Sequence, residues 1–261
     1  MREIILNEEI REKVLTLDNF IGKGNEGRVF KYTDSETLKI YYSIFSDYIF
    51  HSDRKPNDIE LDASETYHNR ILDLELRQNL IGRTSLPKGR ITLNNLTVGC
   101  ILKYHDNHFP LVMHYFENDE TVLKTFREIC KSVNELTTYC IYPTDVHEQN
   151  ILIERKTNMP ELIDVDGEYI HISDTPNQAD QDETYYKTML LIINYIRLKK
   201  SNNPAMSDEE VFDSINILPE FRELLLRFNP SYEEIMELIN YLSKDKILEK
   251  APTYRLINKP F

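Results

Sequence analysis

The sequence predicts an α+β fold with two lobes. Residues 1–103 are expected to form a small antiparallel β-sheet lobe with one helix, and residues 104–261 a larger, mainly helical lobe. Segments with the alternation and the β-branched or aromatic content of strands concentrate before residue 104, whereas amphipathic helical patterns dominate after residue 120. A length of 261 residues is sufficient for one large domain or for two such lobes.

The strands of the first lobe are separated by turn-forming residues. Thr33-Asp34-Ser35 and Asn94-Asn95 each lie between two apolar runs, which predicts two hairpins. Between these hairpins, one segment carries leucine and isoleucine at helical spacing among charged residues, which predicts the helix. The expected strands cover residues 29–32, 37–41, 90–94 and 96–104, and the expected helix covers residues 62–80.

The second lobe is expected to be helical apart from one short strand pair. Its amphipathic segments are separated by Asn203-Pro204, Pro219 and Asn229-Pro230, which are typical of helix boundaries. The expected helices cover residues 121–138, 182–199, 208–216, 220–228 and 232–242, and the strand pair covers residues 151–153 and 161–163.

Composition excludes several functional classes. The chain has 31 Lys and Arg against 44 Asp and Glu, so its net charge of -13 opposes non-specific binding to nucleic acid or to anionic membranes. No apolar run approaches the roughly 20 residues of a membrane span, and the first residues lack the plan of a signal peptide. Cys100, Cys130 and Cys140 form no CxxC pair. We therefore expect a cytoplasmic protein without a nucleic-acid or membrane partner.

Glycine is concentrated in one segment. The chain has seven glycines, of which Gly22, Gly24 and Gly27 lie within Ile21-Gly-Lys-Gly-Asn-Glu-Gly-Arg-Val-Phe30. Glycines at this spacing let the backbone turn tightly and present its N–H groups to a bulky anion. A strand pattern follows, whereas a dinucleotide-binding fold would place a helix there. The segment is therefore expected to be a tight loop before a strand hairpin, and on its own it fits either a phosphate-binding loop or an ordinary approach to that hairpin.

Four further motifs follow the glycine segment in a fixed order. They are Lys39 on an expected strand, a carboxylate on the expected helix and, in the second lobe, Asp145-Val-His-Glu-Gln-Asn150 and Asp164-Val-Asp-Gly167. With Val29, these motifs resemble the protein-kinase-like superfamily over roughly residues 15–200. The Asp-x-His-x-x-Asn form is similar to that of the atypical bacterial-type protein kinases and the aminoglycoside and choline phosphotransferases.

The resemblance implies ATP as a cofactor, bound between the lobes. The glycine segment would cover the phosphates, Lys39 would pair with them, and a helix carboxylate would hold Lys39 in place. Glu75 is preferred over Glu65 for that role. The adenine would hydrogen-bond to the backbone around Ile101 to Tyr104, where the last expected strand of the first lobe leads into the linker. The residues implied to bind ATP are Gly22, Gly24, Gly27, Val29, Lys39, Glu75, Ile101 and Lys103.

The resemblance also implies Mg²⁺ and a transfer of the γ-phosphoryl group to a hydroxyl. Asp145 would accept or orient the proton of the attacking hydroxyl. Asn150 and Asp164 would bind Mg²⁺, which prefers oxygen ligands. Asp166 would assist Asp164 or cap the turn. His147 would contact the transferred phosphate or pack.

Departures from the superfamily pattern bear on the acceptor. Pro143-Thr144 stand before Asp145 where protein kinases usually carry His-Arg, and Asp182 follows Asp164 by only 18 residues. A long peptide-docking segment therefore does not fit, whereas the regular glycine segment slightly favours a protein acceptor over a small molecule. A binding module without turnover and a nucleotidyl transferase remain alternatives.

Three histidines lie near the expected junction of the lobes. His105, His108 and His114 are expected to be linker residues and not metal ligands, because no nearby carboxylate or thiol in the sequence completes a ligand set.

Overall fold

The larger sheet of the protein has six strands of mixed direction. The computed structural model describes residues 2–51, 53–81, 84–166, 170–200, 207, 210, 219–244 and 248. The strand order is β1-β5-β6-β4-β3-β2. These strands are β1 (Arg2–Ile5), β2 (Phe20–Lys23), β3 (Arg28–Lys31), β4 (Glu36–Ile40), β5 (Gly89–Leu93) and β6 (Leu96–Lys103).

The four expected strands of this sheet are confirmed as β3 to β6, and two more strands extend it. The expectation of a purely antiparallel sheet is wrong at one edge, where β1 runs parallel to β5. Ile4 of β1 is buried, and the Leu6 N–H donates to Thr92 O at 2.7 Å, which continues this pairing. At the other edge, β2 contains Gly22 and pairs with β3 through an irregular register. Six of the ten residues of the glycine segment, 21–23 and 28–30, therefore lie in strands.

Three helices accompany this sheet, so the expectation of one helix is wrong. The expected helix begins earlier, because Asn57 and Glu60 form a capping box at its start. The helix after β4 escaped prediction because its sequence, Tyr-Ser-Ile-Phe-Ser-Asp-Tyr-Ile-Phe, has the aromatic and β-branched content of a strand. It is helical where Phe45, Tyr48 and Ile49 bury one face. The helices are α1 (Glu8–Val14), α2 (Tyr42–Phe50) and α3 (Asp58–Arg77), and the 3-10 turn η1 (Gln78–Leu80) follows.

Beyond the larger sheet, long helices accompany two small sheets. The expected strand pair is confirmed as antiparallel and gains a third strand, giving the order β10-β9-β7, and a second sheet pairs β11 with β8. The expected helices at 121–138, 182–199, 220–228 and 232–242 are confirmed with shifted ends. Gly167 and the expected helix at 208–216, apart from residue 210, lie outside the described residues. The elements are β7 (His108–Pro110), α4 (Leu111–His114), α5 (Asp119–Thr138), β8 (Ile141–Pro143), β9 (Ile151–Glu154), β10 (Pro160–Leu162), β11 (Ile170–Ile172), α6 (Gln178–Lys200), α8 (Pro219–Leu226) and α9 (Tyr232–Lys244).

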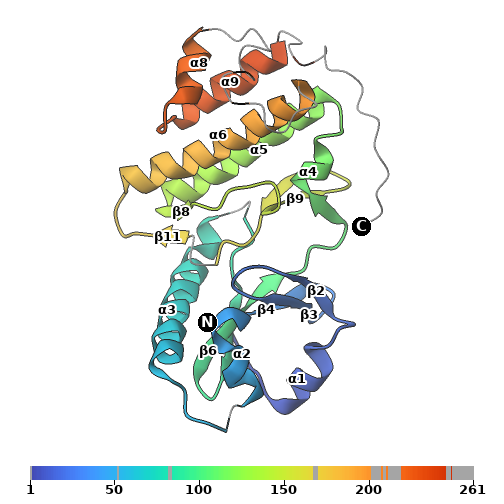
Figure 1. Ribbon diagram of the computed structural model, residues 1–261, viewed down its shortest axis with the longest axis vertical. Coiled ribbons are helices and arrows are strands. Elements are labelled where there is room, and N and C mark those ends of the chain that lie inside the picture. Colours follow the sequence, from blue (N-terminus) through green and yellow to red (C-terminus); the bar gives the residue numbers. More distant parts are fainter. Residues whose placement is uncertain are drawn as a thin grey trace.

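Two hydrophobic clusters form the core, and α3 contributes to both. Figure 1 shows the larger sheet with α1 to α3 at one end of the molecule, and α5 side by side with α6 towards the other. Tyr67 and Ile71 of α3 belong to the cluster of the larger sheet, where Tyr67 stacks on Tyr41 with ring centroids 3.9 Å apart. Leu74, one turn later, belongs to the cluster of the long helices. Arg77 then donates to Tyr139 O, at 3.0 Å.

None of the helices within the described ranges has the length and apolar content that crossing a bilayer requires.

Candidate functional site

Residues 24–27 of the glycine segment form the turn between β2 and β3. The Gly24 N–H donates to Gly27 O at 2.9 Å and closes the turn. A Cβ on Gly27 would collide with the carbonyl oxygen of Ile40, so the close approach of this turn to β4 requires glycine. A Cβ on Gly22 or Gly24 would meet open space. Gly27 therefore allows the turn to pack closely against β4. Gly22 and Gly24 leave the outer side of the turn unobstructed.

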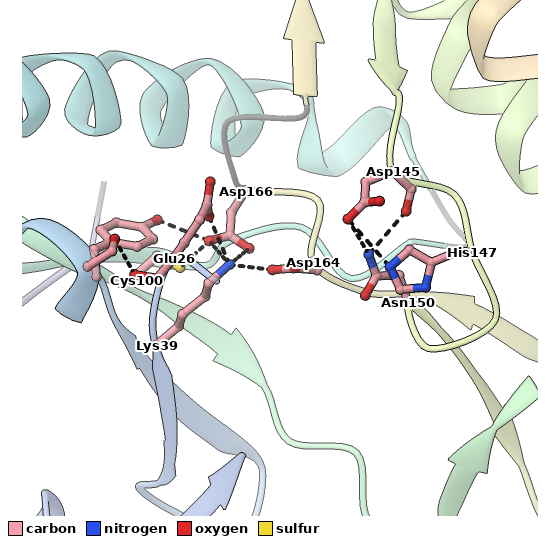
Figure 2. Close-up of polar contacts among 10 residues, drawn as sticks. Glu26, Lys39, Cys100, Asp145, His147, Asn150, Asp164 and Asp166 are labelled. Atoms are coloured by element: carbon pink, nitrogen blue, oxygen red, sulfur yellow. Dashed lines mark hydrogen bonds and ion pairs between the residues drawn. The ribbon is translucent and has the colours of Figure 1, made fainter. Parts of the chain in front are cut away.

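Lys39 of β4 is the centre of a buried charge cluster. Its ammonium forms ion pairs with Asp164, with Asp166 at 3.1 Å and with Glu26 at 3.4 Å, although its side chain is only 6% exposed. Figure 2 shows these carboxylates converging on Lys39 from three directions. Burial alone would lower the pKa of Lys39, but Asp166 and Asp164 outweigh burial and raise it well above the ordinary value. Lys39 is therefore a fixed cation.

The carboxylate on Lys39 does not come from the expected helix. Among the described residues, Glu26, Asp164 and Asp166 contact the Lys39 ammonium, and Glu75, which the sequence predicts for this role, is not one of them. Leu74, directly before Glu75, packs in the hydrophobic cluster of the long helices, so this turn of α3 lies beyond the larger sheet. Glu26 is instead held near Lys39 because its carbonyl accepts hydrogen bonds from the N–H and hydroxyl of Ser43, at 3.1 and 2.7 Å.

Asp166 is fully buried and has a complete set of donors. In addition to Lys39, its Oδ2 accepts hydrogen bonds from the Tyr41 hydroxyl at 3.0 Å and from the Cys100 thiol at 3.3 Å. Burial, with the negative charge of Asp166, raises the pKa of Cys100 well above its ordinary value. Cys100 is therefore a neutral donor and not a nucleophile. The Asp-x-Asp spacing was the sequence signal for this residue, but its partners were not predictable.

A second polar group lies in the loop between β8 and β9. Asn150 Nδ2 donates to both Asp145 O and Asp145 Oδ2, each at 3.1 Å. The Ile163 N–H donates to Asn150 O at 2.9 Å, which ties this loop to the residue before Asp164. The sequence-predicted residues Asp145, Asn150 and Asp164 line one small pocket with several apolar residues. In Figure 2, Asp164 lies between the Lys39 cluster and the Asp145 group.

His147 contacts the carboxylate of the same loop. Its Nδ1 accepts a hydrogen bond from the Gln149 N–H at 3.1 Å, so in the neutral ring the proton is on Nε2. Nε2 lies 3.5 Å from Asp145 Oδ2. Oδ2 is therefore held by two groups, and among the described residues none donates to Oδ1.

The expected adenine contacts stay a prediction. Ile101 is buried in β6 between two strands, and its carbonyl already accepts a hydrogen bond from the Lys88 N–H at 2.8 Å. The Tyr104 N–H donates to Ser35 O at 2.9 Å. Lys103 extends towards Glu161, with 2.7 Å between its ammonium and Oε2. Much of the polar backbone and side-chain capacity expected here is already engaged within the protein.

The charge of the cluster suits a hard cation. Carboxylate oxygens of Glu26, Asp164 and Asp166 lie within 4.8 Å of one another. Three carboxylates against the Lys39 ammonium leave a formal charge of 3 × (-1) + 1 = -2. Because the amide nitrogen of Asn150 faces Asp145, its amide oxygen is left for a cation as well. These oxygens are the type of ligand that Mg²⁺ prefers.

No protein-family model matches the chain, and no curated protein matches it. The resemblance to a superfamily therefore depends on the order of the motifs and on the geometry described above.

Proposed function

We propose that the chain is an ATP- and Mg²⁺-dependent phosphotransferase with a bilobal protein-kinase-like fold. It transfers the γ-phosphoryl group to a hydroxyl, with protein serine or threonine slightly preferred over a small aminoglycoside-type or choline-type acceptor. The observation that carries this proposal is the ion pair between Lys39 and Asp164, which are 125 residues apart in the sequence. Asp164 also lines the pocket that contains Asp145 and Asn150.

Asp145 and its neighbours would handle the acceptor. With Oδ2 held by Asn150 and facing His147, Oδ1 of Asp145 is positioned to accept the proton of the attacking hydroxyl. The geometry favours a positioning role for His147, because its ring faces this carboxylate.

Lys39 and the metal-binding residues would act on the nucleotide. The Lys39 ammonium offers a positive charge to the phosphates, and Asn150 and Asp164 would hold Mg²⁺. When bound, the metal supplies neutralisation of the charge on the phosphates. The protein mainly orients the reactants and places charge, as phosphoryl transfer requires.

One observation favours a second candidate, a binding module without turnover. Glu26 contacts Lys39 from the glycine segment, so it competes with phosphates for the ammonium. A nucleotidyl transferase would use the same metal-binding residues with ATP in the opposite orientation.

The test uses γ-labelled and α-labelled ATP in parallel, with Mg²⁺ and a panel of protein and small-molecule acceptors. We expect transfer of the γ label, its loss in Asp164→Ala, and a decrease of about 10²- to 10⁴-fold in Asp145→Asn. Asp18→Asn, at an exposed position, is the matched control. Transfer of the α label alone would indicate a nucleotidyl transferase. Thermal stabilisation by Mg-ATP without transfer or ATP turnover would indicate the binding module, and neither stabilisation nor turnover would reject the proposal.

A further inference from the structure

Two histidines and a glutamate form a cluster beside the connection between β6 and β7. His105 lies in that connection, His108 begins β7, and Glu161 lies on β10. His108 is opposite Glu154 of β9, and Glu161 is opposite Leu152, two residues away, so both side chains occupy the same face of the small sheet. The expectation that no carboxylate accompanies these histidines is therefore wrong, because the strand pairing brings one from 53 residues beyond His108.

The third histidine of the sequence motif lies elsewhere. His114 is fully buried, and its Nε2 bonds with the Thr125 hydroxyl at 2.8 Å.

The distances within the cluster match those between ligands of one metal ion. Glu161 Oε2 lies 3.3 Å from His105 Nδ1 and 3.8 Å from His108 Nε2. One ligand atom from each residue lies within 4.8 Å of the others. Nitrogen and oxygen ligands at about 2.0–2.2 Å from a tetrahedral zinc ion are themselves about 3.3 Å apart. If these three ligand atoms moved slightly closer together, they would occupy three of the four positions of a tetrahedral site.

The hydrogen bonding of the histidines independently points to a cation. His108 Nδ1 lies 2.6 Å from Asp106 O, and because a carbonyl only accepts, Nδ1 carries the hydrogen. In the neutral ring, the Nε2 lone pair then faces a carboxylate, and either a metal ion or a proton between the two atoms turns this repulsion into an attraction. Metal-binding histidines commonly donate their second ring nitrogen to a backbone carbonyl in this way. His105 Nδ1 is buried, and Glu161 Oε2 lies 3.3 Å from it without regular hydrogen-bond geometry.

Lys103 neutralises the same carboxylate from the other side. Its ammonium lies 2.9 Å from Glu161 Oε1 and 2.7 Å from Oε2. The lysine side chain is 45% exposed and can withdraw from Oε2 towards solvent while it keeps Oε1. In that arrangement Oε2 faces the histidines, and Lys103 competes with a metal only in part.

We propose that His105, His108 and Glu161 bind a divalent transition-metal ion of the Zn²⁺ type. Two imidazoles and one carboxylate suit such an ion better than Mg²⁺, which prefers oxygen ligands alone. The ion fastens the connection between β6 and β7 to β10, so its role is structural. This site is separate from the proposed Mg²⁺ site, and its test requires neither ATP nor turnover.

The test is a calorimetric titration of Zn²⁺ into the full chain after treatment with a chelator. We expect one equivalent to bind to the wild-type protein, and affinity to fall at least about tenfold in His108→Ala and in Glu161→Gln. His171→Ala is the matched control, because His171 also pairs with a carboxylate but at an exposed position. Zn²⁺ should also raise the melting temperature of the wild type and of the control, and not that of the two ligand variants.

A lysine variant and a folding check test the same site in other ways. Lys103→Met should bind Zn²⁺ more tightly than the wild type, since it loses the competing ammonium. Circular dichroism in the chelator checks that each variant folds, and His105→Gln replaces His108→Ala if that variant does not. Equal binding by all variants would assign the zinc to an adventitious ligand such as Cys140 and overturn the proposal, as would absence of binding to the wild type.

Discussion

Replacing Lys39 by methionine removes the ammonium that three carboxylates face. Loss of one partner from a buried ion pair costs about 3–5 kcal/mol, because the remaining charge stays buried without compensation. Asp166 bears this cost, since its side chain is fully buried, whereas the Asp164 side chain is 39% exposed and is partly solvated. We therefore expect Lys39→Met to lose about 3–5 kcal/mol of unfolding free energy near pH 8. For a chain of this size, the melting temperature would fall by about 6–20 °C.

The loss of unfolding free energy in Lys39→Met should become smaller as the pH falls. In the wild type, the raised pKa of Lys39 means that its stabilisation is fully present below about 10.5 and is lost only as the pH rises through the folded-state value. Lys39 therefore adds no pH dependence near neutrality. In the variant, a buried carboxylate without its cation favours the protonated form, so the folded state binds more protons than the unfolded state as the pH falls. We expect a smaller loss at about pH 5 than at about pH 8.

The assay is urea denaturation, followed by circular dichroism, at both pH values. Lys23→Met is the control, because Lys23 is an exposed lysine of β2. Adding Asp166→Asn to Lys39→Met should recover about 1–3 kcal/mol near pH 8, since the uncompensated charge is then absent. Equal losses in Lys39→Met and Lys23→Met, or a loss that does not depend on pH, would refute the reasoning about the buried cluster.

Three further predictions concern the glycine turn and Glu161. Glu26→Gln should bind Mg-ATP several-fold more tightly by thermal shift, because a charge that competes with the phosphates is lost; weaker binding would instead make Glu26 a metal ligand. Gly27→Ala should lose about 1–3 kcal/mol in urea denaturation through its collision with β4, whereas Gly22→Ala should change little. Burial opposes ionisation of Glu161, but the adjacent imidazole and ammonium groups outweigh it and lower its pKa to about 2. The stabilisation by Glu161 is thus present above about pH 4.5 and is lost as the pH falls towards 2. The unfolding free energy of Glu161→Gln should therefore depend less on pH in that interval than that of the wild type. An unchanged pH dependence would contradict this.

The secondary structure was predictable where the local pattern agrees with the tertiary environment. The strands at 37–41 and 96–104 and the helix at 121–138 have regular patterns, and the structure confirms them. α2 was missed because its composition favours a strand, and burial against the larger sheet decides otherwise. β1 was missed because four residues carry little pattern, and only the parallel partner β5 makes them a strand.

The candidate site was predictable as a set of residues but not as a set of contacts. The order of the motifs singled out Lys39, Asp145, Asn150 and Asp164, and the structure brings them close together. The sequence could not show that Glu26 turns inwards, because the direction of a loop side chain depends on what holds its backbone. The Glu161 cluster was missed for a similar reason, since strand pairing across β9 joins residues that no local motif connects.

α3 has a consequence for how the protein unfolds. Successive turns of this one helix, at Ile71 and Leu74, belong to different hydrophobic clusters, and Arg77 at its end holds the backbone of Tyr139. Melting either cluster would remove the apolar packing of one part of α3, and helices in proteins owe most of their stability to such packing. We therefore expect the two clusters to lose their structure together, in one cooperative transition, with α3 as the element that transmits the loss from one to the other.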